Sequence, residues 1–269
     1  MFKKRKTYSL DELNAFRVAY GNPLERKEIF STLFIAFLIA GIYTFALFYY
    51  WWLALIVGGL GVFYAYRFIL PDDVKRVYEV NAFRERNNFI NNITQILTNP
   101  DRTVLEALKI VEERANGEFK EDLVVLQASL MNANKEEIQQ AFQELGKKYE
   151  HDVIFDMYIE QLTTAAIEGR TNVETLKDIK TYHNEIKKRQ DSFMNAKKRE
   201  AYNFKFITVI GFVLIMAISF SFGWEQFVTV YAHSPIGWVT SGIYLILLGG
   251  FYNSFRKRLV DDNIMEVKI

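Results

Sequence analysis

Residues 29–66 read IFSTLFIAFLIAGIYTFALFYYWWLALIVGGLGVFYAY, and none of these 38 residues is Asp, Glu, Lys or Arg. A helix needs roughly 20 apolar residues to cross a bilayer, so this stretch is long enough for two crossings. The aromatic run Tyr49-Tyr50-Trp51-Trp52 divides it near its middle. We therefore predict a transmembrane hairpin over 29–70, with spans at about 29–48 and 52–70.

A second uncharged region lies near the other end of the chain. Residues 206–224 and 226–255 contain no Asp, Glu, Lys or Arg and are separated only by Glu225. This region predicts a second transmembrane hairpin over 205–254, with spans at about 205–224 and 236–254. The first apolar run begins too late and is too long for a cleaved signal peptide, so we expect the first span to be retained.

The block between the hairpins is polar and close to electrically neutral. Residues 67–205 contain 22 Lys and Arg against 24 Asp and Glu. A block of this length can build one core, and its charge balance gives no reason to expect nucleic acid as a partner. Its apolar residues recur at helical spacing, as in Leu123, Leu126 and Leu130. Turn and cap residues divide it into six expected helices, at about 72–98, 102–115, 118–131, 135–149, 152–168 and 172–200.

The distribution of Lys and Arg predicts the orientation in the membrane. Seven precede Ile29, 22 lie in the middle block and four follow Phe255, whereas the two inter-span turns, Tyr49–Trp52 and Gly223–Pro235, contain none. Cytoplasmic segments carry the excess of Lys and Arg. We therefore expect an all-α polytopic protein of the plasma membrane, in which two transmembrane hairpins flank one cytoplasmic six-helix bundle. Its cytoplasmic parts are expected to be an N-terminal segment (1–28), the bundle (71–204) and a tail (255–269).

Three of the expected helices begin in a similar way. Residues 104–108, 138–142 and 173–176 each follow a polar turn and place apolar or small residues at i, i+3 and i+4. Ordinary amphipathic helix starts account for this pattern when each segment is taken alone. Their order along the chain, within 97–108, 134–145 and 165–176, resembles the cytoplasmic domain of the type II secretion system F family, and the layout is most similar to its single-domain TadB/TadC-type members.

That resemblance covers the chain from about residue 80 to the end, and the preceding two spans match the layout of the same family, which includes the GspF/PilC platform proteins. Asn99-Pro100-Asp101 and Gly169-Arg170 stand where that family often has glycine. The resemblance implies a non-enzymatic inner-membrane platform protein without a cofactor. It also implies three kinds of partner: a hexameric secretion ATPase, pilin or pseudopilin subunits, and a paralogous platform protein or a second copy of the chain.

The sequence contains no recognisable catalytic or metal-binding constellation. There is no Cys, which removes disulfides, thiolate nucleophiles and Cys metal ligands. His151 stands at a predicted helix start, His183 on a charged helix face and His233 in the outer loop. No two of them share a metal-ligand spacing, so we interpret each as an ordinary surface or capping residue.

A membrane-embedded lipid-modifying enzyme is an alternative function, because the sequence contains two acidic pairs. Asp72-Asp73 and Asp261-Asp262 could hold magnesium with a substrate phosphate, but neither has a second acidic motif at helical spacing. Roles at a helix start and in the tail are the simpler interpretation. Gly58-Gly59-Leu60-Gly61 lies inside a span, where close packing of Ala54 and Gly58 against another helix is the more plausible use.

A small-solute transporter is the other alternative. The spans contain no ionisable residue of the kind that ion paths usually need, although hydroxyls remain at Thr44, Ser219, Ser221 and Ser241. Two basic clusters precede the third span and are the candidate contact residues for lipid headgroups or an acidic partner surface. These residues are Lys187, Lys188, Arg189, Lys197, Lys198 and Arg199.

Overall fold

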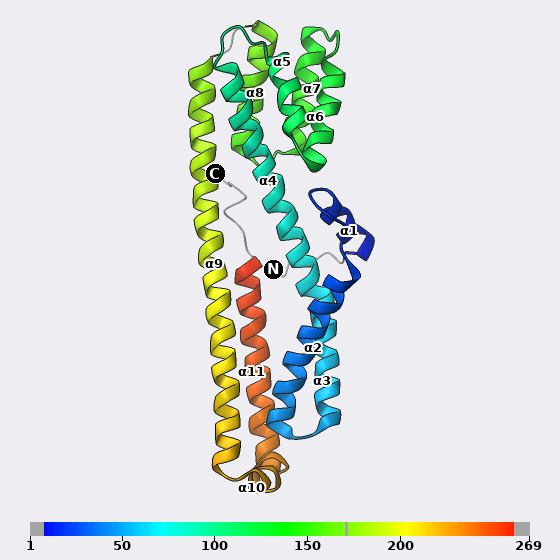
Figure 1. Ribbon diagram of the computed structural model, residues 1–269, viewed down its shortest axis with the longest axis vertical. Coiled ribbons are helices and arrows are strands. Elements are labelled where there is room, and N and C mark those ends of the chain that lie inside the picture. Colours follow the sequence, from blue (N-terminus) through cyan, green and yellow to red (C-terminus); the bar gives the residue numbers. More distant parts are fainter. Residues whose placement is uncertain (1–7, 170–171, 261–269) are drawn as a thin grey trace. The chain divides into compact units, whose positions relative to one another are not determined.

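The computed structural model describes residues 8–169 and 172–260, and within these ranges the chain is helical with no β-strand. Figure 1 shows the order of the elements. The all-α prediction is confirmed. The chain divides into two compact units. The span unit comprises described residues 8–14, 23–75 and 195–260, and the core unit comprises 15–22, 76–169 and 172–194.

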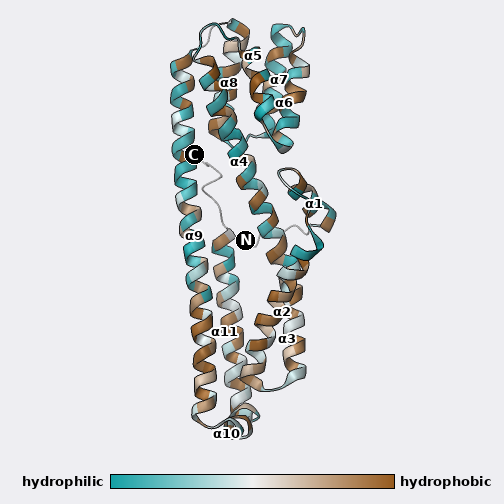
Figure 2. Cartoon of the chain, viewed as in Figure 1, coloured by the Kyte–Doolittle hydropathy of each residue, from teal (hydrophilic) through white to brown (hydrophobic). Residues whose placement is uncertain are grey.

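Within the described residues, four helical stretches are long and apolar enough to cross a membrane, which confirms the predicted number of spans. Figure 2 shows hydrophobic residues along α2, α3, α11 and the second part of α9. Most of their large apolar side chains are exposed, as expected for surfaces that face lipid. The stretches are Arg26–Phe48 (α2), Trp51–Ile96 (α3, η1 and most of α4), Val173–Ser221 (α9) and Pro235–Leu259 (α11).

The first two spans pack closely through small residues. A side chain at Gly58 would meet the Phe37 ring at 2.7 Å, and one at Gly61 would meet Ala40 Cβ at 3.0 Å. Small residues let neighbouring helix backbones approach, which is a common basis of packing inside membranes. The interpretation of Gly58 as a packing position is confirmed. Tyr49 forms the turn between α2 and α3 (Trp51–Tyr64). Its φ is 55°, in the left-handed region, and its N–H donates to Phe45 O at the end of α2.

The segment after α9 differs from the expected loop. It forms a short helix, α10 (Trp224–Gln226), followed by a π-helical turn, η2 (Phe227–Ala232), which buries Phe227 and Ala232. The Tyr49 ring contacts Trp224 edge-on at 4.7 Å, and the Tyr50 ring stacks on His233 at 4.3 Å. This end of the span unit is therefore closed by aromatic residues from both hairpins.

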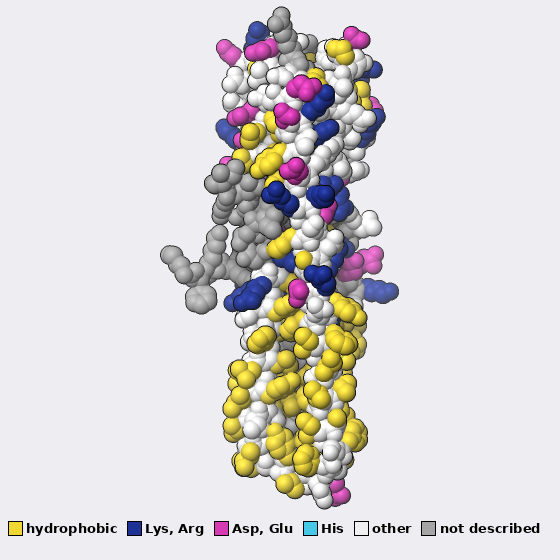
Figure 3. All heavy atoms as spheres, turned by 90° about the vertical axis from the view of Figure 1, so that its left-hand side faces the viewer, with side chains coloured by type: hydrophobic (Ala, Val, Ile, Leu, Met, Phe, Trp, Pro, Cys, Tyr) yellow, Lys and Arg dark blue, Asp and Glu magenta, His cyan; other side chains and the backbone are white. Residues whose placement is uncertain are grey.

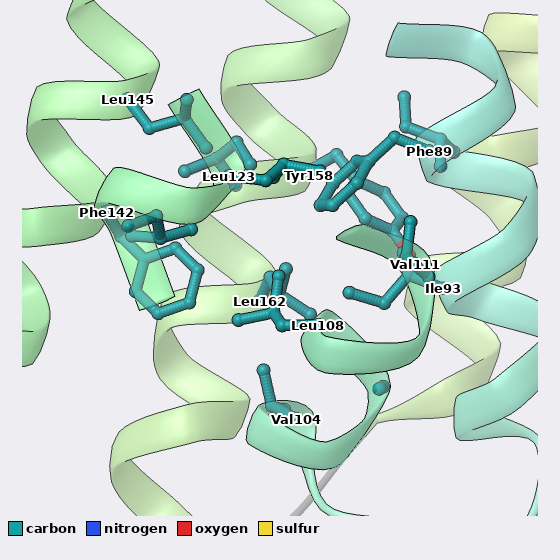
Figure 4. Packing of buried hydrophobic residues seen from close by; sticks show 14 of the residues in the cluster. Phe89, Ile93, Val104, Leu108, Val111, Leu123, Phe142, Leu145, Tyr158 and Leu162 are labelled. Atoms are coloured by element: carbon teal, nitrogen blue, oxygen red, sulfur yellow. The ribbon is translucent and has the colours of Figure 1, made fainter. Parts of the chain in front are cut away.

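The core unit has one continuous apolar cluster. Its largest members include Phe89, Phe119, Phe155 and Tyr158, each 2% exposed or less. Figure 4 shows how side chains from successive helices interdigitate in this cluster. The helices that supply it are α4 (Leu70–Leu97), α5 (Val104–Arg114), α6 (Gly117–Leu130), α7 (Lys135–Lys148), α8 (Val153–Glu168) and α9 (Val173–Ser221). The six segments predicted as helices are therefore helical, whereas a cytoplasmic location of the unit remains a prediction.

Residues 15–22 belong to the core unit although the span unit follows them directly in the chain. They include the end of α1 (Leu10–Val18). Glu118 donates its backbone N–H to Ala19 O at 2.9 Å. Gly117 has a φ of +62°, and a side chain there would meet Ala19 O at 2.1 Å and the Tyr20 ring at 2.7 Å. Only glycine combines this backbone conformation with so close an approach.

Candidate functional site

The candidate contact residues lie on α9 but differ in their surroundings. In the core unit, Lys188 and Arg189 are exposed and Lys187 is half-buried. In the span unit, Lys198 and Arg199 are exposed, whereas Lys197 is buried and donates from Nζ to Leu259 O at 3.0 Å. A cation at the last turn of α11 satisfies a carbonyl that has no partner within the helix, and it interacts favourably with the helix dipole. Lys197 therefore has a structural contact that separates it from its neighbours.

The three similar helix starts share a capping interaction in the structure. The side chain of Thr103 accepts from Glu106 N, that of Asn134 from Glu137 N and that of Asn172 from Thr175 N. At the first two, the glutamate also accepts from the backbone of the capping residue, completing a capping box. The repeated sequence pattern thus corresponds to three N-capped helix starts, of α5, α7 and α9. The neighbouring Arg170 lies outside the described residues.

The core unit contains a buried charged network that joins α4, α8 and α9. Arg86 Nε donates to Asp152 Oδ2 at 2.8 Å. His183 is fully buried, and its Nε2 lies 3.5 Å from the same oxygen. The other ring nitrogen, Nδ1, is 2.9 Å from the Asn87 amide nitrogen. Because an amide nitrogen can only donate, Nδ1 is the acceptor and the ring proton sits on Nε2, facing Asp152.

The network continues through two asparagines. Asn91 and Asn184 exchange two side-chain hydrogen bonds of 2.9 Å, and Asn87 also donates to Asn184 Oδ1. The His183 ring stacks on Phe83 with centroids 4.9 Å apart. Polar groups buried in this way are stable only when their partners are in place. The network therefore fixes how the first part of α9 sits against α4.

Asp152 has two functions in this network. Its Oδ1 accepts from Phe155 N at 3.1 Å and so caps the start of α8, while Oδ2 faces Arg86 and His183. Burial alone would raise the pKa of Asp152, but the His183 imidazole and the Arg86 guanidinium hold that pKa below its usual range. The carboxylate is therefore ionised and paired at neutral pH. Because His183 is enclosed by protein, this arrangement is suited to holding α4, α8 and α9 together.

A second polar cluster lies where residues 15–22 meet α6. Tyr78 donates to Glu118 at 2.7 Å, and Lys148 Nζ contacts Glu118 at 2.8 Å and Asp122 at 2.7 Å. The Tyr20 ring lies 5.5 Å from that of Tyr78. Burial, together with the charge of Glu118, raises the pKa of Tyr20 to about 12. The cluster thus attaches the segment before the first span to the core unit.

The three histidines have different surroundings. His151 is exposed, in agreement with a surface role, and His233 is exposed with its ring stacked on Tyr50. The prediction for His183 was wrong, because this residue is buried beside Asp152 rather than lying on a charged surface. Nothing in its own helix signals this, since charged and polar residues surround it in sequence. The only hint was His151-Asp152 at a helix start, which marked the carboxylate but not its partners.

The acidic pair Asp72-Asp73 lies in the first turn of α4, as predicted, but that turn is not a free helix start. The helix continues from η1 (Ala65–Ile69), because Leu70 donates its N–H to Ala65 O. Asp73 instead forms an ion pair with Arg256, with 3.2 Å between Asp73 Oδ1 and Arg256 Nη1. Asp261-Asp262 lies outside the described residues. Among the residues that the structure describes, no group of three or more His, Asp or Glu side chains could hold a metal ion.

Three span hydroxyls are buried among the four at Thr44, Ser219, Ser221 and Ser241. Thr44, Ser219 and Ser241 are at most 2% exposed, whereas Ser221 is exposed. Thr44 and Ser219 donate to the carbonyls of Ala40 and Ile215, four residues earlier in their own helices. These two hydroxyls thus donate their protons within their own helices.

Comparison with known proteins finds a relative that covers nearly the whole chain. An uncharacterized protein of Bacillus anthracis, pXO2-23, is 46% identical to this chain over 266 residues, which is 99% of the chain and 96% of that protein. The chain belongs to the same family as this protein. No family model matches the chain, and no solved structure matches it.

Proposed function

We propose that this member of the pXO2-23 family is a non-enzymatic platform protein of a type II secretion or Tad-like pilus assembly machine. In this role it couples a cytoplasmic secretion ATPase to the assembly of pilin or pseudopilin subunits. The observation that carries the proposal is a helical core unit inserted between two pairs of apolar helices, with the segments that resemble the F family at the capped starts of α5, α7 and α9.

The proposed role also assigns the two units to compartments. The six helices α4 to α9 form the cytoplasmic bundle, and both termini are cytoplasmic, because Lys and Arg gather outside the apolar stretches on the same side. This orientation is tested by cysteine labelling, since the natural chain has no Cys. An impermeant reagent added to intact cells should label Val230→Cys and leave Glu136→Cys unlabelled. The opposite pattern would invert the orientation.

The partnership is tested by co-purification. The full chain, extracted in mild detergent, should retain the P-loop ATPase encoded beside its gene. Substitutions on the exposed surface of the core unit should release that ATPase without unfolding the chain. An ATPase that never co-purifies, or neighbouring genes for a permease or for lipid synthesis instead of pilins, would contradict the proposed function.

Force transmission is tested in the helix that contributes to both units. Val173–Ser221 is one helix, so a displacement of the core unit would act directly on the third span. Inserting seven Gly and Ser residues after Asn203 should abolish assembly while ATPase binding persists, because a flexible coil transmits little thrust. A helix-forming insert of seven residues is the matched control, since it keeps the following face within about 20°. Normal assembly with the flexible insert would refute mechanical coupling.

A further inference from the structure

Five exposed cations lie on two helices at one end of the span unit. They are Lys198, Arg199 and Lys205 on α9 and Lys257 and Arg258 on α11. Within the described residues none of the five forms an ion pair, and the one acidic residue among them, Glu200, is exposed. This end of the span unit therefore has an excess of positive charge that the described chain does not compensate.

Two contacts hold these parts of α9 and α11 together. Lys197 Nζ donates to Leu259 O at 3.0 Å, and the rings of Phe204 and Phe255 stack with centroids 4.5 Å apart and an angle of 10°. Residues 197–204 of α9 therefore lie beside residues 255–259 of α11. The exposed cations of both helices consequently lie at the same level along the span unit.

The charged surface continues directly into the apolar surface of the spans. On one face of α9, Lys198 is followed at helical spacing by Tyr202, which is 70% exposed, and by Phe206 and Val209, each 59% exposed. Figure 3 shows Lys and Arg side chains bordering the hydrophobic surface of the spans. A change from cation to tyrosine to apolar residue within three helical turns is typical of the interface between headgroups and hydrocarbon.

We propose that Lys198, Arg199, Tyr202, Lys205, Lys257 and Arg258, which lie at this level of the span unit, bind the phosphate groups of anionic lipids. Cations gathered at one level of the span unit repel one another, and anionic phosphate groups bound beside them lower that repulsion. A zwitterionic headgroup brings its own cation and gains less. The exposed apolar residues that follow in α9, such as Phe206 and Val209, can contact acyl chains. They therefore favour a lipid phosphate over free inorganic phosphate. This inference does not rest on the proposed function.

The test uses the full chain in detergent micelles, titrated with phosphatidylglycerol, phosphatidylcholine or inorganic phosphate. We expect phosphatidylglycerol to bind and the other two to bind at least tenfold more weakly. The variant K198Q/R199Q/K205Q should bind phosphatidylglycerol at least tenfold more weakly, because each cation near a membrane surface contributes about fivefold. The matched control, K109Q/K135Q/K147Q, removes the same charge from exposed positions of the core unit and should bind as the natural chain does.

Equal affinity for phosphatidylcholine or for inorganic phosphate would overturn the proposal. So would an equal loss of affinity in the control variant, which would show an effect of net charge alone. Unchanged lipid affinity in K198Q/R199Q/K205Q, with loss of a protein partner, would assign the surface to that partner instead. If this variant does not fold, K257Q/R258Q decides the matter in the same titration, with at least a fivefold loss expected.

Discussion

The two units treat buried polar groups in opposite ways. The core unit encloses a charged network, in which Arg86, Asp152 and His183 meet inside an apolar cluster. In the apolar spans, the buried hydroxyls of Thr44 and Ser219 donate to carbonyls of their own helices. The large apolar side chains of the spans are mostly exposed instead of forming a core.

This difference follows from the solvent on each side of the helices. Water drives apolar side chains of the core unit into one cluster, and a paired charge network within it specifies how the helices meet. In lipid, apolar side chains gain little by leaving the surface, so small residues and close contacts hold the helices together. One chain can therefore use buried charged side chains to specify helix packing in one unit, while the apolar stretches 29–66 and 206–224 of its other unit contain no Asp, Glu, Lys or Arg.

The largest expected effect breaks the charged network. Asp152→Asn should destabilise the core unit by about 3–5 kcal/mol, because Arg86 would keep its buried charge without a carboxylate. Hydrogen exchange of the full chain should accelerate in peptides from α4, α8 and α9 and stay unchanged in α2. Asp191→Asn, at an exposed position of α9, is the control and should change stability by less than about 0.5 kcal/mol. Equal exchange in both variants would refute the role of the network.

A smaller effect is expected where residues 15–22 contact the start of α6 within the core unit. Gly117→Ala should lower stability by about 2–3 kcal/mol, since the added methyl group collides with Ala19 and the backbone conformation is unfavourable. Gly169 has a similar φ of +66° but open space around it, so Gly169→Ala should cost only about 1 kcal/mol. Proteolysis within residues 15–22 should increase in the first variant alone. Identical susceptibility would mean that the close approach is unimportant.

The adjacent lysines of the span unit sharpen the comparison further. Lys197→Met should destabilise this unit by about 1.5 kcal/mol through loss of the bond to Leu259, whereas Lys198→Met should change stability by less than about 0.5 kcal/mol. Thermal unfolding followed by tryptophan fluorescence measures this unit selectively, because Trp51, Trp52, Trp224 and Trp238 all belong to it. The two variants melting together would contradict the capping role of Lys197.

The smallest expected effect is a change in stability when the pH is lowered. The pKa of Asp152 is lowered in the folded chain, so its contribution to stability is present above the unfolded pKa and is lost as pH falls through the folded value. The stability difference between the natural chain and Asp152→Asn should therefore be constant near neutrality and shrink below about pH 4, by at most about 1.4 kcal/mol per pH unit. Denaturation at several pH values measures this difference. A gap that widens in acid would contradict the sign of the shift.

The sequence by itself determined the helical elements and the division between apolar and polar parts. Uncharged stretches of about 20 residues or more predict membrane-crossing helices, and the spacing of apolar residues in the polar block predicts helices there. Asn134 and Asp152 marked helix starts because their short side chains satisfy free N–H groups locally. Such signals lie within a few residues of each other, so no tertiary contact is needed to recognise them.

Only the tertiary structure decided which polar side chains are buried. His183 stands among charged residues of α9, and its burial depends on Phe83 and Asn87, roughly a hundred positions earlier. Lys197 and Lys198 are indistinguishable in sequence, yet the approach of α11 gives only the first a carbonyl partner. The π-helical turn at Phe227–Ala232 was likewise taken for a loop. In each case the environment is created by segments distant in sequence, and local pattern contains no information about which of them will meet.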